Sequence, residues 1–95
     1  MKVFIADYCL DVVDYLKHIV EDLGYVAVGC TSSNDFTEIL SRDVFDLVIL
    51  DWNIRAGDDT SLLEWMNTAL PTRPPVIMMA SRSAKRESRN VMRHG

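Results

Sequence analysis

The chain has 95 residues, of which 48% are apolar and 25% charged, and its formal net charge is −4. This length predicts one domain over residues 1–95, with the composition of an ordinary globular protein. No apolar run is long enough to cross a membrane, and an acidic body lacks the clustered positive charge that nucleic-acid binding requires. We therefore expect neither a membrane nor a nucleic acid as a partner of this domain.

The first residues and the cysteines indicate the compartment. The start, MKVFIAD, contains an apolar stretch that is too short for a signal peptide, and an aspartate ends it. Cys9 and Cys30 fit no metal-binding spacing and are expected to be free thiols. These features predict a cytoplasmic protein.

The chain opens with a predicted strand and helix. The run KVFIA at residues 2–6 predicts a buried strand. Apolar residues then recur at helical spacing from Leu10 to Leu23, with charged residues on the other face, which predicts an amphipathic helix. Gly24 follows directly, where a left-handed residue would end the helix.

Two further strands are predicted on either side of a short second helix. They are YVAVGC at residues 25–30 and VFDLVIL at residues 44–50. Between them, the stretch TSSND offers residues that can cap a helix. Phe36, Ile39 and Leu40 would form the apolar face of that helix.

A third helix, a fourth strand and a weak fourth helix complete the chain. Asp59 or Thr60 is expected to cap the third helix, which PTRPP ends. Its apolar positions are Leu62, Leu63, Met66 and Leu70. VIMMA at residues 76–80 predicts the fourth strand, and residues 84–94 predict a basic helix with few apolar positions. That basic face is interpreted as a solvated surface, with a docking surface for an acidic partner as the alternative.

The regular alternation predicts an α/β fold, an open parallel sheet with helices on both faces. In the flavodoxin-like strand order 2-1-3-4, the first and third strands are neighbours about 5 Å apart. Asp7 ends the first strand and Asp51 the third, so the two carboxylates should converge at the functional edge of the sheet. Like charges this close repel, and Mg²⁺ would relieve the repulsion. We therefore predict a magnesium site at Asp7, Asp51 and the backbone carbonyl of Asn53.

The chain resembles the receiver domain of two-component response regulators, the CheY-like fold. The similarity lies in KVFIAD, LGY, DLVILDWN and PPVIMMAS, which resemble the first strand, the end of the first helix, and the third and fourth strands. The resemblance implies that Asp51 accepts a phosphoryl group from a histidine kinase or phosphotransfer protein. It assigns Asp7 and the Asn53 carbonyl to the magnesium site. It also implies a signalling module, not an enzyme, that can react with small phosphodonors.

The sequence departs from the family pattern in several places. Tyr8 stands where the family has a second acid, IRAGDD replaces a Pro and Asp-Gly loop, and Ala80 replaces the switch Ser or Thr. The chain ends before the fifth strand, whose end carries the family's Lys, and before the fifth helix. We expect weak magnesium binding and impaired switching. Arg55 would either pair with Asp51 as a counter-ion or lie in solvent.

Other interpretations stay open. A pseudo-receiver would act in protein interaction or dimerisation without phosphorylation. A haloacid-dehalogenase-type phosphatase would use Asp51 as nucleophile, but it needs a second Asp where Asn53 stands.

Without a fifth strand, residues 76–80 become an apolar edge with no charged or proline residue to block pairing. We therefore expect a homo-oligomer through this strand and the helix at residues 84–94.

Overall fold

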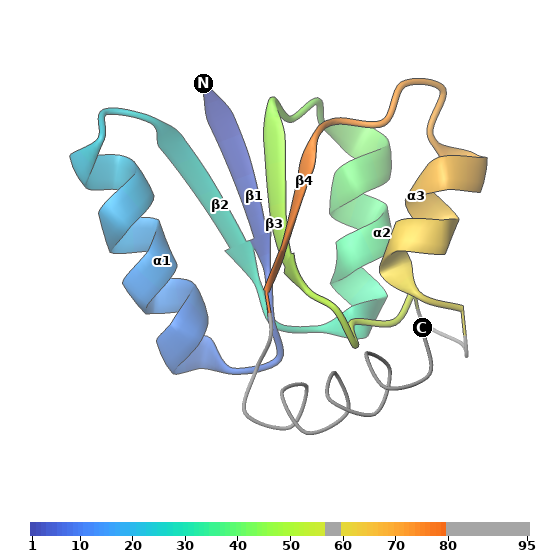
Figure 1. Ribbon diagram of the computed structural model, residues 1–95, viewed down its shortest axis with the longest axis horizontal. Coiled ribbons are helices and arrows are strands. Elements are labelled where there is room, and N and C mark those ends of the chain that lie inside the picture. Colours follow the sequence, from blue (N-terminus) through green and yellow to red (C-terminus); the bar gives the residue numbers. More distant parts are fainter. Residues whose placement is uncertain (57–59, 80–95) are drawn as a thin grey trace, which may run out of the picture.

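The computed structural model describes residues 1–56 and 60–79. The elements in chain order are β1 (Lys2–Ala6), α1 (Leu10–Asp22), β2 (Val26–Cys30), α2 (Ser33–Arg42), β3 (Leu47–Asp51), α3 (Leu62–Ala69) and β4 (Val76–Met79). Within this part of the chain the strands form one parallel sheet in the order β2-β1-β3-β4 (Figure 1). The predicted α/β fold and strand order are confirmed, whereas Ala80 and the helix predicted over 84–94 lie outside the described residues.

Helices cover both faces of the sheet. Successive side chains of β1 point to opposite faces and almost all are buried, which explains why this strand is continuously apolar. On one face, α1 packs in a cluster formed by Val3, Ile5, Val13 and Val20. On the other face, α2 and α3 contribute side chains to a second cluster with residues of the sheet (Figure 1). The main buried residues there are Phe4, Phe36, Val48, Leu50, Ile54, Leu62 and Met66.

Two glycines set the position of α1. Gly24 has a φ angle of 88° and ends the helix in the left-handed conformation, as predicted. Gly29 lets the helix approach β2, since a Cβ atom there would lie 2.3 Å from Cγ1 of Val13. Because α1 packs closely on β2, the loop that joins β1 to α1 ends at a fixed position.

Two strands begin later than their apolar runs predict. β3 starts at Leu47 and not at residue 44, because Val44 is 85% exposed and Phe45 packs on Phe4 from the preceding loop. β2 starts at Val26. The backbone N–H of the preceding residue, Tyr25, donates to the carbonyl of Val20 in the last turn of α1.

The predicted free thiols are confirmed, with Cys9 exposed and Cys30 buried. None of the helices in the described part of the chain has the length and apolar character needed to cross a membrane.

The residue that caps α3 was predicted wrongly. Ser61 is the N-cap, and its Oγ accepts a hydrogen bond from the backbone N–H of Glu64 at 3.2 Å. Thr60 precedes the cap, and its carbonyl accepts from the N–H of Ala56, while Asp59 lies outside the described residues. The spacing Ser-x-x-Glu is a known capping signature, and this signal was available in the sequence.

Replacement of Ser61 by Ala should lower the free energy of unfolding by about 1 kcal/mol, because one amide at the start of α3 loses its acceptor. Urea unfolding followed by circular dichroism measures the change. Ser61→Asp keeps an acceptor at the same position and should leave stability nearly unchanged. Equal losses in both variants would show that the cap does not stabilise α3.

Candidate functional site

The carboxyl ends of β1 and β3 bring Asp7 and Asp51 together at one edge of the sheet. The two strands are direct neighbours, with Ala6 opposite Leu50, so the next residue of each is one of the two aspartates. Asp7 is 6% exposed and Asp51 is 4% exposed, and they are the buried charged side chains of the described residues. This juxtaposition is the one that the strand order required.

Each carboxylate also holds the loop that follows its own strand. The backbone N–H of Cys9 donates to Oδ1 of Asp7 at 2.8 Å, and that of Asn53 donates to Oδ1 of Asp51 at 3.4 Å. In both cases the donor lies two residues after the aspartate, which is the turn that Asp side chains favour. The two loops therefore start in a defined direction from the sheet.

The acidic pair carries unfavourable electrostatics. Burial raises the pKa of Asp7 above its ordinary value, and the amide of Cys9 opposes this rise. The carboxylate of Asp51 raises the pKa of Asp7 further, through its charge and a side-chain hydrogen bond. In the described part of the chain neither carboxylate forms an ion pair with a Lys or Arg. A cation would relieve this arrangement.

The oxygen atoms at this edge fit a hard cation. No group of three or more His, Cys, Asp or Glu side chains that could hold a metal occurs within residues 1–56 and 60–79. The chain thus offers two carboxylates, with Asn53 two residues after Asp51 in the same loop. Magnesium is often held by one or two carboxylates while it keeps several waters, so this limited set suits Mg²⁺ better than a metal that needs a full protein cage.

Tyr8, in place of the family's second acid, forms contacts that the sequence did not reveal. Its hydroxyl shares a hydrogen bond with Oγ of Ser33 at 2.8 Å and accepts one from the backbone N–H of Arg55 at 3.1 Å. The side chain of Arg55 is exposed and forms no ion pair with Asp51 within the described residues. The counter-ion alternative for Arg55 is therefore wrong, and its backbone makes the relevant contact.

Trp52 lies directly after Asp51 and can report on the site. Its backbone N–H donates to the carbonyl of Met79 on β4 at 3.1 Å. Its indole Nε1 is buried and has no hydrogen-bond partner within the described residues. We therefore expect the fluorescence of the indole to change when the loop after β3 rearranges.

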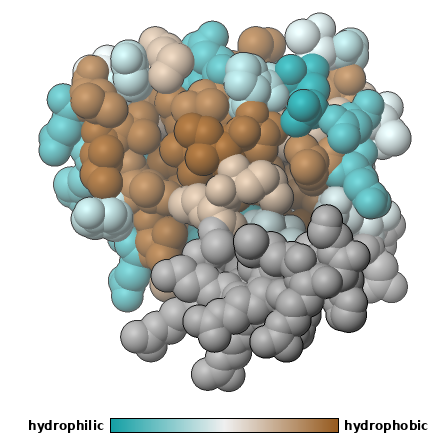
Figure 2. All heavy atoms as spheres, in the orientation of Figure 1, coloured by the Kyte–Doolittle hydropathy of each residue, from teal (hydrophilic) through white to brown (hydrophobic). Residues whose placement is uncertain are grey.

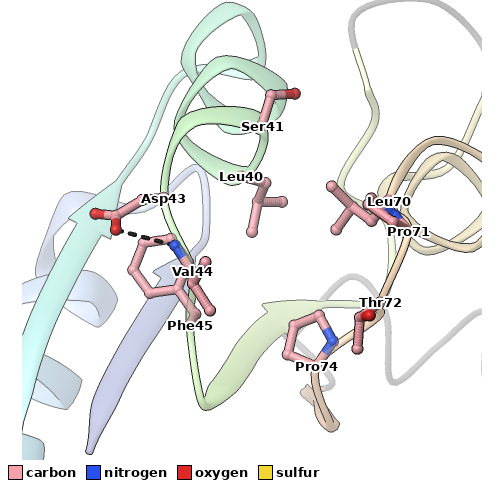
Figure 3. Close-up of a pocket in the computed structure, with 9 residues that line it drawn as sticks. All are labelled: Leu40, Ser41, Asp43, Val44, Phe45, Leu70, Pro71, Thr72 and Pro74. Atoms are coloured by element: carbon pink, nitrogen blue, oxygen red, sulfur yellow. Dashed lines mark hydrogen bonds between the residues drawn. The ribbon is translucent and has the colours of Figure 1, made fainter.

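A pocket of about 490 Å³ lies between the loops that precede β3 and β4 (Figure 3). Its lining is mostly apolar and consists of Leu40, Ser41, Asp43, Val44, Phe45, Leu70, Pro71, Thr72 and Pro74. These loops lie at the amino ends of the strands, whereas Asp7 and Asp51 lie at the carboxyl ends. The pocket is therefore not part of the acidic site.

Asp7→Asn should raise the free energy of unfolding at neutral pH, because it removes one of two buried like charges and keeps an acceptor for the Cys9 amide. The native-state pKa of Asp7 is raised, so wild-type stability falls as pH rises from the unfolded-state pKa through the native one. The advantage of the variant should vanish in acid, below the unfolded-state pKa.

Urea unfolding at several pH values measures this difference. Asp14→Asn, on the exposed face of α1, is the matched control and should change stability little at any pH. Destabilisation of Asp7→Asn at neutral pH would contradict repulsion between the two carboxylates.

Comparison with known proteins adds the family to this geometry. The family described as "Response regulator receiver domain" matches residues 3–95. The receiver domain of Francisella response regulator 1452 is 22% identical and superimposes with a TM-score of 0.70, covering 94% of this chain and 75% of that one. Vibrio cholerae chemotaxis protein CheY4 is 21% identical with a TM-score of 0.63, covering 95% and 78%.

No curated protein matches the chain in sequence. The two structural similarities establish the fold alone, because both sequence identities are low. The family consists of signalling modules that interact with histidine kinases or phosphotransfer proteins and are generally not enzymes. With the family match over nearly its whole length and the CheY-like strand order, the chain belongs to the response regulator receiver domains.

Proposed function

We propose that residues 1–95 act as one receiver module, in which Asp51 accepts a phosphoryl group from a histidine kinase or phosphotransfer protein. The observation that carries this proposal is the position of Asp51 at the end of β3, 4% exposed and beside Asp7. A carboxylate that ends a buried strand is unfavourable unless the site uses it. Two such carboxylates on neighbouring strands favour phosphoryl chemistry over a purely structural role.

The proposed transfer is a simple displacement. An Oδ atom of Asp51 forms a bond to phosphorus while the bond from phosphorus to the donor imidazole nitrogen breaks, and the electron pair leaves with the imidazole. Asp51 must react as the anion.

Asp7, Asp51 and the backbone carbonyl of Asn53 would hold Mg²⁺, as predicted from the sequence. When bound, the ion supplies positive charge that neutralises the phosphoryl oxygens. Tyr8 contributes no second acid here, so we expect weak magnesium binding. Ala80 stands where the family has the switch Ser or Thr, so we expect impaired switching. The free thiols of Cys9 and Cys30 favour a reducing, cytoplasmic setting for this activity.

A phosphorylation-independent pseudo-receiver is the second candidate. It is favoured by Tyr8, which is engaged by Ser33 and Arg55 at the position where the family has an acid. In that case Asp7 and Asp51 would take no part in phosphoryl transfer, and the module would act through protein contacts alone.

Acetyl phosphate with Mg²⁺ should add one phosphoryl group to the wild-type protein, detected by intact-mass spectrometry. Asp51→Asn should abolish the addition, because the nucleophilic oxygen is lost. Asp46→Asn, in the exposed segment before β3, is the matched control and should be modified as the wild type is. Absence of modification in the wild type, or modification that persists in Asp51→Asn, would exclude Asp51 as the acceptor and favour the pseudo-receiver.

We also propose that the module self-associates through β4. This strand pairs with β3 on one side, and no other described strand pairs with it. Ile77 is 50% exposed and Met78 is 44% exposed, and Figure 2 shows apolar side chains gathered over the sheet in this view. An exposed apolar edge strand readily pairs with the same strand of a second copy. The proposed interface covers residues 76–80 and 84–94, of which residue 80 and residues 84–94 lie outside the described part of the chain.

Light scattering at micromolar concentration should give at least twice the monomer mass of 10.8 kDa. Ile77→Lys should shift the protein to the monomer, since a charge on an edge strand opposes pairing. Val26→Lys places the same charge on β2, at the opposite edge of the sheet, and should leave the assembly intact. A monomeric wild type would contradict self-association, and dissociation by Val26→Lys alone would assign the interface to β2.

A further inference from the structure

The side chain of Tyr8 joins three segments around the acidic pair. Tyr8 directly follows Asp7, and its hydroxyl accepts a hydrogen bond from the backbone N–H of Arg55 at 3.1 Å. The same hydroxyl shares a 2.8 Å hydrogen bond with Oγ of Ser33, the first residue of α2. The ring packs against Phe36, with centroids 5.9 Å apart and planes inclined at 44°. Although the residue is 46% exposed, its hydroxyl is thus fixed in place.

The bond to Arg55 links the two loops that carry the proposed metal ligands. Asp7 lies one residue before Tyr8, and Asn53 lies two residues before Arg55. The fully buried side chain of Ile54 anchors the loop after β3 to the core. Ile54 thus fixes the loop after β3 to the core of the domain. The Tyr8 hydrogen bond fixes the same loop to the loop after β1.

We propose that Tyr8 is a positioning residue, whose hydroxyl sets the spacing between the loop of Asp7 and the loop of Asn53. This inference rests on the proposed function. Magnesium requires near-ideal octahedral geometry, so small changes in ligand spacing alter its affinity. Tyr8 offers no anionic oxygen in place of the family's second acid. Its contribution is instead to hold the remaining ligands at a fixed separation.

Tyr8→Phe tests this inference, because it keeps the ring against Phe36 and removes only the hydroxyl. We expect the Arg55 amide to exchange with solvent faster in the variant, as measured by NMR. We expect the dissociation constant for Mg²⁺, measured by Trp52 fluorescence, to rise roughly three- to tenfold, the effect of one lost hydrogen bond. Tyr15→Phe removes a hydroxyl from a residue of α1 that is 67% exposed and should change neither quantity.

Both variants are compared under conditions in which circular dichroism shows them fully folded. An unchanged magnesium constant in Tyr8→Phe would overturn the inference and leave the proposed function standing. A weaker constant with unchanged Arg55 exchange would also overturn it, because the effect would not pass through the loop. If the wild type itself binds no Mg²⁺, the proposed function fails and the inference fails with it.

Discussion

Repulsion between two buried carboxylates, Asp7 and Asp51, is the interaction on which the rest of this molecule depends. The sheet does not allow the pair to separate, because β1 and β3 are hydrogen-bonded neighbours with Ala6 opposite Leu50. Burial removes the water that would otherwise screen the two charges. Burial is the main reason that the pKa of Asp7 is raised, and the charge of Asp51 raises it further. A cation, and then a phosphoryl group, would turn this unfavourable arrangement into a functional one.

The surrounding structure keeps that arrangement in place. Val3, Phe4 and Ile5 are almost fully buried between helices on both faces, so the strand that leads to Asp7 has little freedom to move. Beyond the strands, each carboxylate accepts a hydrogen bond from the amide two residues later. Tyr8 then connects the two loops through the backbone of Arg55. A rigid sheet and tied loops therefore surround a pair that would otherwise relax apart.

The sequence was sufficient for the features that depend on periodicity and on strand ends. The helix from Leu10 and its end at Gly24 follow from local pattern, and the strand order brings Asp7 and Asp51 together. The contacts of Tyr8 could not be predicted, because its two hydrogen-bond partners are distant in the sequence. Ser33 lies 25 positions after Tyr8, and Arg55 lies 47 positions after it. The cap at Ser61 could have been predicted but was missed, since the two preceding residues, Asp59 and Thr60, are also favoured capping types.

The most direct test of the acidic site is a magnesium titration followed by NMR of the side-chain carboxyl carbons. If Asp7 and Asp51 share one cation, both of their signals shift together and saturate at the same concentration. The signals of Asp14 and Asp46, which lie in exposed positions, stay in place. Equal small shifts at all aspartates, or no shift at Asp7 and Asp51, would contradict a cation site at the ends of β1 and β3.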